Sequence, residues 1–142
     1  MENKIFIDAS NLVAGRLASF AAKQALQGNN IEIVNSGNAI LSGNKKNLLS
    51  EYSLRLQRGM PKTGPFYFRT EDRFLKRLIR GMIPYKKPKG SSALKRVRCY
   101  IGIPESLKNQ KFQTLPDASI SNLNTPRYTT IKEICKFMGN KE

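Results

Sequence analysis

Residues 4–35, KIFIDASNLVAGRLASFAAKQALQGNNIEIVN, decide the fold class of this 142-residue chain. The stretch begins and ends with two short apolar runs, KIFID and IEIVN, whose isoleucines and apolar pattern favour β-strands. The residues between them, about 20 in number, have helical spacing, and Gly28 fits the left-handed cap that ends a helix. Two strands joined by such a helical crossover pair in parallel, with a right-handed connection. We therefore expect an α/β protein built on a βαβ unit.

The helix predicted between these strands has one apolar face. Its larger side chains recur at helical spacing, and the alanines between them would let the helix lie close to a sheet. The larger members are Val13, Leu17, Phe20, Ala21 and Leu26, and the small ones are Ala14, Ala18, Ala22 and Ala25. We assign this helix to the core.

A strand, a glycine-containing turn and a helix also raise the possibility of a dinucleotide-binding enzyme. That fingerprint needs several glycines beside the pyrophosphate, but DASNLVAGRLAS offers only Gly15. SGNAILSGNKK is not a phosphate-binding loop, because no Ser or Thr follows Lys45 and Lys46. We interpret Gly15 as a packing contact and Asp8 as a cap or turn residue rather than a catalytic acid. A nucleotide-dependent enzyme or RNA modifier is the alternative function that this layer leaves open.

Several further elements follow the βαβ unit. Residues 36–44 are predicted as a short strand or turn, and Asn44 as the N-cap of a helix over about residues 45–58. The later elements are a short helix over residues 90–97, a strand over residues 98–102 and a last helix that ends at Gly139. Thr130 and Glu133 have the spacing of a capping box for that last helix.

The middle of the chain is predicted as a loop followed by a helix. The loop at residues 59–68 ends in three aromatic residues, Phe66, Tyr67 and Phe68. We expect these rings to be buried and to hold the loop in place. Thr70 is the expected N-cap of the next helix, and Glu71 and Asp72 lie in its first turn, where the helix dipole favours negative charge.

The charge of the chain is strongly positive and unevenly distributed. With 25 Lys and Arg against 10 Asp and Glu, the formal net charge is +15 and the pI is near 10.2. Residues 55–98 hold fourteen basic and two acidic side chains, a net charge of +12, whereas residues 1–54 and 99–142 contribute +1 and +2. This balance indicates an acidic partner, and nucleic acid is the first candidate.

Other features of the composition narrow the function. The chain has no histidine, and its two cysteines, Cys99 and Cys135, are far apart and form no CxxC pair. We expect both cysteines to be small buried hydrophobes, with no disulfide and no zinc site. The N-terminus lacks the apolar run of a signal peptide, and no stretch approaches the roughly 18 apolar residues of a membrane span. A cytoplasmic protein is the default expectation.

The helix after Thr70 divides into a cationic face and an apolar face. Four cations fall within an arc of about 100°. They are Arg73, Lys76, Arg77 and Arg80, and the apolar residues Phe74, Leu75, Leu78, Ile79 and Met82 centre on the opposite side. Solvated helix faces normally mix signs, but these cations have no acidic partner among them. Phosphates would offset their repulsion by releasing counterions, whereas a membrane surface would require exposed large apolar groups beside the charge.

The loop PYKKPKG, residues 84–90, extends this basic surface. It contributes three lysines, Lys86, Lys87 and Lys89. Pro84 and Pro88 stiffen the chain and disfavour helix at the residue before each, so we expect the lysines on a semi-extended arm. Tyr85 is expected either to stack on a base or sugar or to be buried. Such an arm suits an irregular RNA fold better than a B-DNA groove.

At this point the sequence resembles a known family. RGMIPYKKPKGSSALKRVRCYIGIP, residues 80–104, is similar to the signature of the large-subunit ribosomal protein L13 family, the universal uL13 family. That signature contains R-G-M-[LIV]-P, a basic linker, G-x-x-A-L and a strand ending in x-G-I-P. DASNLVAGRLAS and VNSGNAILSGNKK match the family in type and order, and TGPFYFRTEDRFLKRLIRGM matches its archaeal and eukaryotic form. The resemblance runs over residues 5–104 and is loose beyond them.

The resemblance implies both a fold and a role. It implies a three-layer α/β/α single domain over residues 1–142, around a small mainly parallel sheet with basic helices and loop extensions. It implies a structural constituent of the large ribosomal subunit that binds large-subunit (23S-type) rRNA, acts early in subunit assembly and catalyses no reaction. The implied partners are this rRNA and neighbouring ribosomal proteins, without a membrane, cofactor, metal or small-molecule substrate, and the protein is expected to be a monomer within the ribosome.

The resemblance and the charge pattern each supply candidate rRNA-contacting residues. By resemblance they are Arg80, Gly81, Met82, Pro84, Lys86, Lys87, Lys89 and Gly90, with Ser42, Gly43, Asn44 and Lys45 as a second set. Met82 is alternatively a core residue, and Gly81 a requirement of the backbone. On charge alone we add Arg55, Arg58, Lys62, Arg69, Arg73, Lys76, Arg77 and Arg96. The segment 55–98 is therefore expected to face the RNA.

Overall fold

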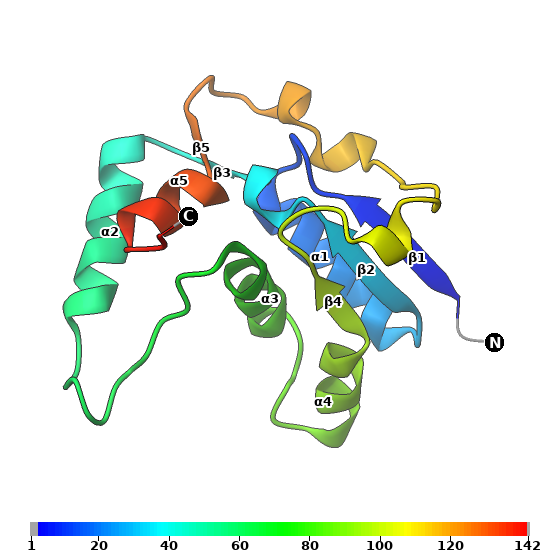
Figure 1. The fold of residues 1–142 in the computed structure, drawn as a ribbon, viewed down its shortest axis with the longest axis horizontal. Helices are drawn as coiled ribbons and strands as arrows, with labels where there is room; N and C mark the ends of the chain where they lie inside the picture. Colours follow the sequence, from blue (N-terminus) through cyan, green and yellow to red (C-terminus); the bar gives the residue numbers. More distant parts are fainter. Residues whose placement is uncertain (1–2, 142) are drawn as a thin grey trace.

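A computed structural model describes residues 3–141 and contains a three-stranded parallel sheet (Figure 1). Its strands are β1 (Lys4–Asp8), β2 (Asn30–Val34) and β4 (Val97–Cys99), in the order β1-β2-β4. The register pairs Ile5 with Ile31, and Ile31 with Val97, so these side chains share one face of the sheet. The predicted α/β class around a small mainly parallel sheet is confirmed.

Three helices pack on this apolar face. They are α1 (Ala14–Leu26), α3 (Glu71–Gly81) and α4 (Pro88–Lys95). Each contacts the sheet, and α1 lies against both α3 and α4. The alanines of α1 allow this close packing, because all five that face the core are at most 3% exposed. The assignment of this helix to the core is confirmed.

The segment before α1 differs from the prediction. The helix begins at Ala14, because Asn11 has a left-handed φ of 59° and the next two residues pair with other parts of the chain instead. The Val13 N–H donates to the Ala118 carbonyl at 2.7 Å, and Leu12 forms a bridge with Ser119. Gly15 is exposed, and a Cβ there would meet nothing within 4 Å, so its interpretation as a packing contact is wrong.

A second, two-stranded sheet lies beside the first. β3 (Ile40–Ser42) and β5 (Tyr128–Thr130) pair antiparallel, and they lead into α2 (Lys45–Gln57) and α5 (Ile131–Phe137). The Asn44 side chain accepts from the Lys46 N–H, which confirms the predicted N-cap of α2. Of the predicted capping box of α5, the Thr130 hydroxyl accepts from the Glu133 N–H at 3.3 Å. The Glu133 carboxylate instead forms an ion pair with Lys45, at 3.3 Å.

The chain after β4 covers part of the second face of the parallel sheet. This segment contains three 3-10 turns, η2 (Glu105–Leu107), η3 (Pro116–Ala118) and η4 (Ile120–Asn122). Gln113 forms a parallel bridge with Ile7 at the β1 edge. The Phe112 ring contacts Phe6 edge-on, at 6.4 Å between centroids, and Phe6 points away from the helices because it alternates with Ile7. An irregular segment therefore packs where a long helix would lie in a more regular layered fold.

The two cysteines, Cys99 and Cys135, lie in or beside the core. Cys135 is fully buried and Cys99 is half-buried, and burial raises the pKa of each thiol to about 12. Neither cysteine forms a disulfide. None of the helices within residues 3–141 combines the length and the apolar character needed to cross a membrane.

Candidate nucleic-acid interface

The helix α3 holds its cations outward because its other side is anchored in the core. Leu75 and Ile79 are fully buried, and Phe74 is 7% exposed. Arg73 is exposed, and the other cations of the same side are half-buried. Met82, predicted on the apolar side, is 46% exposed beyond the end of the helix, and the following residue, Ile83, is buried in its place.

The start of α3 is fixed by Glu71. Thr70 occupies the N-cap position as predicted, but its hydroxyl makes no capping hydrogen bond. The Glu71 side chain is 3% exposed and lies against the turn η1 (Ser36–Asn38) so closely that Gly37 has no room for a Cβ. Glu71 therefore packs inside the protein, against η1.

Aromatic rings hold the arginines of α3. The Arg73 guanidinium lies over the Phe68 ring at 5.4 Å, and Arg77 lies over Tyr67 at 5.0 Å. Arg80 lies over Tyr85 at 4.5 Å. A ring face attracts a cation through its quadrupole and leaves the net charge unchanged. These contacts therefore position three guanidinium groups and keep their positive charge available to a partner.

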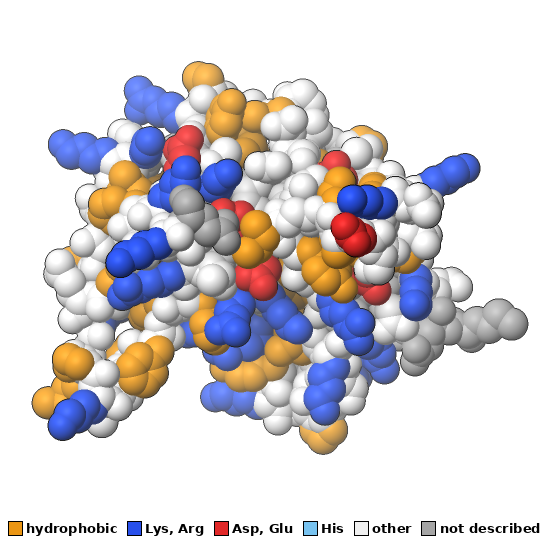
Figure 2. Space-filling model, in the orientation of Figure 1, with side chains coloured by type: hydrophobic (Ala, Val, Ile, Leu, Met, Phe, Trp, Pro, Cys, Tyr) orange, Lys and Arg blue, Asp and Glu red, His pale blue; other side chains and the backbone are white. Residues whose placement is uncertain are grey.

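The cations of α3 have no carboxylate partner among the described residues. Lys45 pairs with Glu133, and Arg55 pairs with Glu51, and neither of these ion pairs within residues 3–141 involves a cation of α3. Figure 2 shows lysine and arginine side chains gathered below the middle of the visible face, over α3 and α4. The surface formed by Arg73, Lys76, Arg77 and Arg80, called the α3 cationic face below, thus carries a net positive charge.

Two hollows follow the α3 cationic face. One, of about 230 Å³, is lined by all four of its cations together with Phe68 and Leu94. The other, of about 350 Å³, is lined by Arg98 of β4 together with Arg73 and Lys76, and also by the acidic Asp72. Arg98 is not among the residues predicted from charge or resemblance, although the strand pattern indicates it, because Arg98 alternates with the buried Val97 and is exposed.

The predicted semi-extended arm at residues 84–90 is wrong. The chain makes a compact turn, in which the Tyr85 N–H donates to the Ile83 carbonyl at 2.8 Å and the Lys87 N–H donates to the Pro84 carbonyl at 3.0 Å. It then enters α4 at Pro88, so that Lys89 and Gly90 lie in a helix. Gly90 permits this fold, because any Cβ at that position would collide with the Pro84 carbonyl. The lysines of this turn, Lys86, Lys87 and Lys89, are nevertheless exposed.

The prediction that the aromatic residues of the preceding loop are buried is wrong for two of them. Phe66 is 64% exposed and Phe68 is 43% exposed, whereas Tyr67 is half-buried. The Tyr67 and Phe68 rings contact arginines of α3 instead of packing in the core. The loop tip, residues 59–66, also exposes Met60 and forms part of a lobe with apolar side chains in Figure 2.

The remaining candidate residues lie in three other places. Ser42, Gly43, Asn44 and Lys45 join β3 to α2, and the pairing of Ser42 with Tyr128 puts them at the end of α2 that Figure 1 shows away from α4. Arg55, Arg58, Lys62 and Arg69 lie along the end of α2 and the loop that follows it. The Arg96 side chain donates to the Ala25 carbonyl at 3.1 Å and so links α4 to the last turn of α1. These residues do not share the hollows of the α3 cationic face.

Asp8, the acid considered above for catalysis, makes hydrogen bonds that stabilise the turn after β1. Burial disfavours the charged form of Asp8, but its carboxylate accepts hydrogen bonds from the Ser10 N–H at 3.0 Å and from Asn35 at 3.1 Å. Those bonds outweigh burial and hold the pKa of Asp8 below its ordinary value of 3.8. Asp8 is thus a turn residue, as predicted. Nowhere in residues 3–141 do three His, Cys, Asp or Glu side chains gather to hold a metal ion.

The fold and this surface define a class of protein, a small basic α/β protein that displays cations held by aromatic rings. Comparison with known sequences gives the family. A sequence model of ribosomal protein L13 matches residues 2–106. The chain belongs to the ribosomal protein L13 family, whose members are structural proteins and not enzymes, which confirms the expectation that it is not an enzyme.

The relatives of the chain are similar over nearly its whole length. It is 42% identical to "Large ribosomal subunit protein uL13" of Methanosarcina barkeri, over 95% of this chain and 97% of the relative. The proteins of the same name from Methanococcoides burtonii and Methanopyrus kandleri are 38% and 41% identical, over 95% and 94% of this chain and 97% and 85% of their own lengths. These relatives confirm the predicted archaeal type.

Proposed function

We propose that this protein is a structural constituent of the large ribosomal subunit and that it binds large-subunit rRNA through segment 55–98. Membership of the ribosomal protein L13 family supports the place in the subunit. The observation that supports RNA as the direct partner is the α3 cationic face, whose cations lack carboxylate partners among residues 3–141. Phosphates are the groups that such a surface binds most favourably, since each contact releases condensed counterions.

The surroundings of the α3 cationic face extend the proposed interface. Lys86, Lys87 and Lys89 are exposed on the compact turn and the first turn of α4, directly after α3. Arg98 borders the same hollow as Arg73. A folded RNA lying along α3 would therefore meet cations from a helix, a turn and a strand on one rigid body, with little ordering entropy to offset on binding.

The exposed apolar loop tip suits a different contact in the subunit. Met60 and Phe66 are 68% and 64% exposed, which is unusual for two large side chains in one short loop. A neighbouring ribosomal protein would remove this apolar surface from water. In the proposed arrangement the loop tip packs against protein, while the α3 cationic face packs against RNA.

Early action in assembly is part of the proposal. The α3 cationic face is built on residues that the protein buries by itself, such as Leu75 and Ile79, so the surface does not depend on other ribosomal proteins for its shape. A preformed site of this kind can bind rRNA before later proteins arrive. Pulse-labelled protein should therefore enter large-subunit precursors that still lack late-binding proteins, and entry only into completed subunits would contradict early binding.

Sedimentation of a cell lysate tests the place in the subunit. The protein should be recovered with the large subunit, and recovery only in the light fractions would contradict the proposal.

The phosphate contacts are tested by replacing Lys86, Lys87 and Lys89 with Ala and measuring affinity for a large-subunit rRNA fragment across salt concentrations. The slope of log K against log[salt] should become shallower by about 2 to 3 if all three lysines contact phosphate. An unchanged slope would show that this turn does not touch the RNA backbone.

A further inference from the structure

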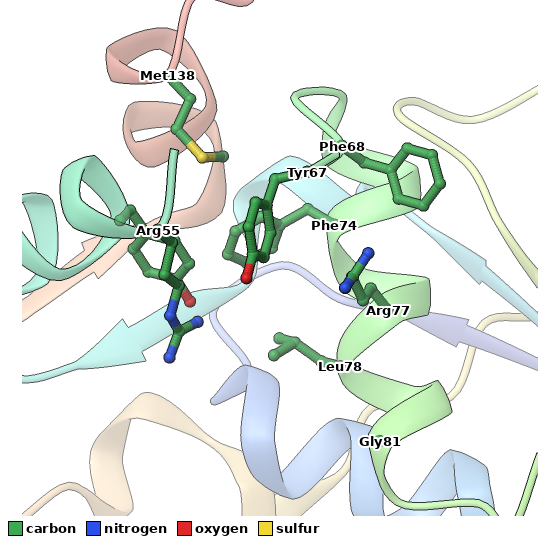
Figure 3. A pocket seen from close by; sticks show the side chains of 9 residues that line it. Arg55, Tyr67, Phe68, Phe74, Arg77, Leu78, Gly81 and Met138 are labelled. Atoms are coloured by element: carbon green, nitrogen blue, oxygen red, sulfur yellow. The ribbon is translucent and has the colours of Figure 1, made fainter. Parts of the chain in front are cut away.

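An aromatic pocket opens beside the α3 cationic face, between α2, α3 and α5. Its volume is about 250 Å³, and its walls include Tyr52, Phe74, Leu78 and Met138. Figure 3 shows the Tyr67 ring standing across the pocket, with Phe74 behind it, Leu78 below it and Met138 above it. The Tyr52 and Phe74 rings contact each other at 5.3 Å between centroids and so form a continuous aromatic wall.

Two arginines flank the pocket. In Figure 3 the Arg55 side chain lies on one side of the Tyr67 ring and the Arg77 guanidinium on the other. Arg55 is held over the Tyr52 ring at 4.9 Å and is paired with Glu51. Arg77 is a member of the α3 cationic face and lines both this pocket and the neighbouring hollow. The pocket is therefore joined directly to the proposed phosphate-binding surface.

The size and lining of the pocket define its ligand. A volume of about 250 Å³ is below the roughly 300–1,000 Å³ of clefts that hold drug-sized ligands, so the pocket suits one flat ring system better than a dinucleotide. Aromatic walls favour a planar π-system, and adjacent cations favour a ligand that carries a phosphate. An unpaired nucleotide has both parts, with its base and its phosphate about one sugar apart.

We propose that this pocket receives one unstacked base of the bound RNA, while the phosphate next to that base lies against Arg77. The proposal rests on the rRNA binding proposed above and adds a site for a single nucleotide to it. Recognition of RNA commonly uses bases that leave the stack and lie against aromatic side chains. The RNA segment bound here must then contain a bulge or loop, because a base within a continuous helix cannot reach the pocket.

Gly81 provides a way to close the pocket without changing the charge. It is the last residue of α3 and lines the pocket, and a Cβ built there meets nothing within 4 Å. A Gly81→Leu side chain would start in open space and occupy the volume proposed for the base. Gly15→Leu is the matched control, because Gly15 is also an exposed helical glycine with open space around it, and it lies in α1 away from segment 55–98.

The probe is the rRNA fragment that the full-length protein protects from nuclease digestion. We expect Gly81→Leu to weaken binding of this fragment at least about fivefold, the lower limit for loss of one stacked base, and Gly15→Leu to leave it unchanged. The salt slope should stay the same for both variants, because no cation is removed. Dimethyl sulfate and carbodiimide should reveal one base that is protected by the wild-type protein and becomes reactive with Gly81→Leu.

The outcomes separate this inference from the function on which it rests. If the wild-type protein protects no rRNA fragment, both proposals are lost. If it binds RNA but Gly81→Leu matches Gly15→Leu and releases no base, RNA binding stands and the pocket holds something else, such as a side chain of a neighbouring protein. Should Gly81→Leu fail to fold by circular dichroism, Tyr67→Leu is tested by chemical protection alone, because loss of the ring that holds Arg77 would lower its affinity in any case. One base that becomes reactive with Tyr67→Leu supports the inference, and an unchanged protection pattern contradicts it.

Discussion

The helices α2 and α3 are both basic, but the cations of the two helices have different partners. In α2, Arg55 is paired with Glu51 four residues earlier, and Lys45 is paired with Glu133 of α5. In α3, no cation takes part in either of these ion pairs, and three arginines lie over aromatic rings. Arg55 of α2 also lies over a ring, that of Tyr52, but it is paired with a carboxylate as well. The charge of α2 is largely cancelled within the protein, whereas the charge of α3 is held in place and left for an external anion.

The two helices also differ in how they are anchored. The only side chain that α2 buries is Tyr52, whereas α3 buries Phe74, Leu75 and Ile79. Deep anchoring fixes the backbone of α3, so binding to its outer face costs little conformational entropy. This difference teaches that the number of lysines and arginines in a helix does not identify an interface. The partners of those side chains and the rigidity of the helix identify it.

The largest expected effect comes from removing the anchor of α3. Leu75→Ala should lower the free energy of unfolding by about 2–5 kcal/mol, because Leu75 is fully buried and its loss leaves a cavity. Leu54→Ala is the matched change in α2, where the side chain is 59% exposed, and it should cost no more than about 0.5 kcal/mol. Denaturant unfolding of both variants measures the difference, and equal losses would show that α3 is no better anchored than α2.

A smaller effect is expected when an arginine of α3 loses its ring. Tyr85→Leu leaves the charge of Arg80 in place but removes the ring face 4.5 Å from its guanidinium, a contact of about 0.5–1 kcal/mol. Affinity for the rRNA fragment should fall about two- to fivefold with an unchanged salt slope. Tyr85→Phe should restore it, because it keeps the ring. If Leu and Phe bind alike, the ring does not position Arg80 for RNA.

The smallest effect is expected when an arginine of α2 loses its acid. Glu51→Gln breaks an exposed pair at i,i+4 spacing and should lower the free energy of unfolding by only about 0.3–0.5 kcal/mol. It also releases the charge of Arg55, so affinity for rRNA should not decrease. Isothermal titration of the rRNA fragment measures this, and a decrease comparable to that of Tyr85→Leu would mean that the two helices do not differ as described.

Most of the fold could be predicted because local patterns dictate it. KIFID and IEIVN become β1 and β2, and the alanine-rich segment between them becomes α1, because isoleucine alternation and helical spacing are properties of neighbouring residues. The start of α1 was misplaced, since the backbone of Val13 pairs with Ala118, more than 100 residues later in the chain. No local pattern reports such a long-range hydrogen bond.

The candidate site could be predicted only in part. Helical phase identified the four cations of α3, because the spacing that buries Leu75 and Ile79 also turns those cations outward. The roles of Tyr67 and Phe68 were missed, since an aromatic residue in a loop is normally assigned to the core and a ring that supports a cation has no sequence pattern of its own. The compact turn at residues 84–90 was missed because its cause, the close approach of Gly90 to the Pro84 carbonyl, exists only in three dimensions.

The most direct test compares the salt dependence of rRNA binding between variants that remove positive charges from α2 and variants that remove them from α3. The Arg73→Gln, Arg77→Gln, Arg80→Gln triple variant should make the slope of log K against log[salt] shallower by about 2 to 3, because three phosphate contacts are lost. The Lys45→Gln, Arg55→Gln double variant should change it by less than about 1, since both cations are already paired with carboxylates. An unchanged slope for the triple variant, or an equal loss per charge in both helices, would contradict the claim that α3 presents its cations to RNA.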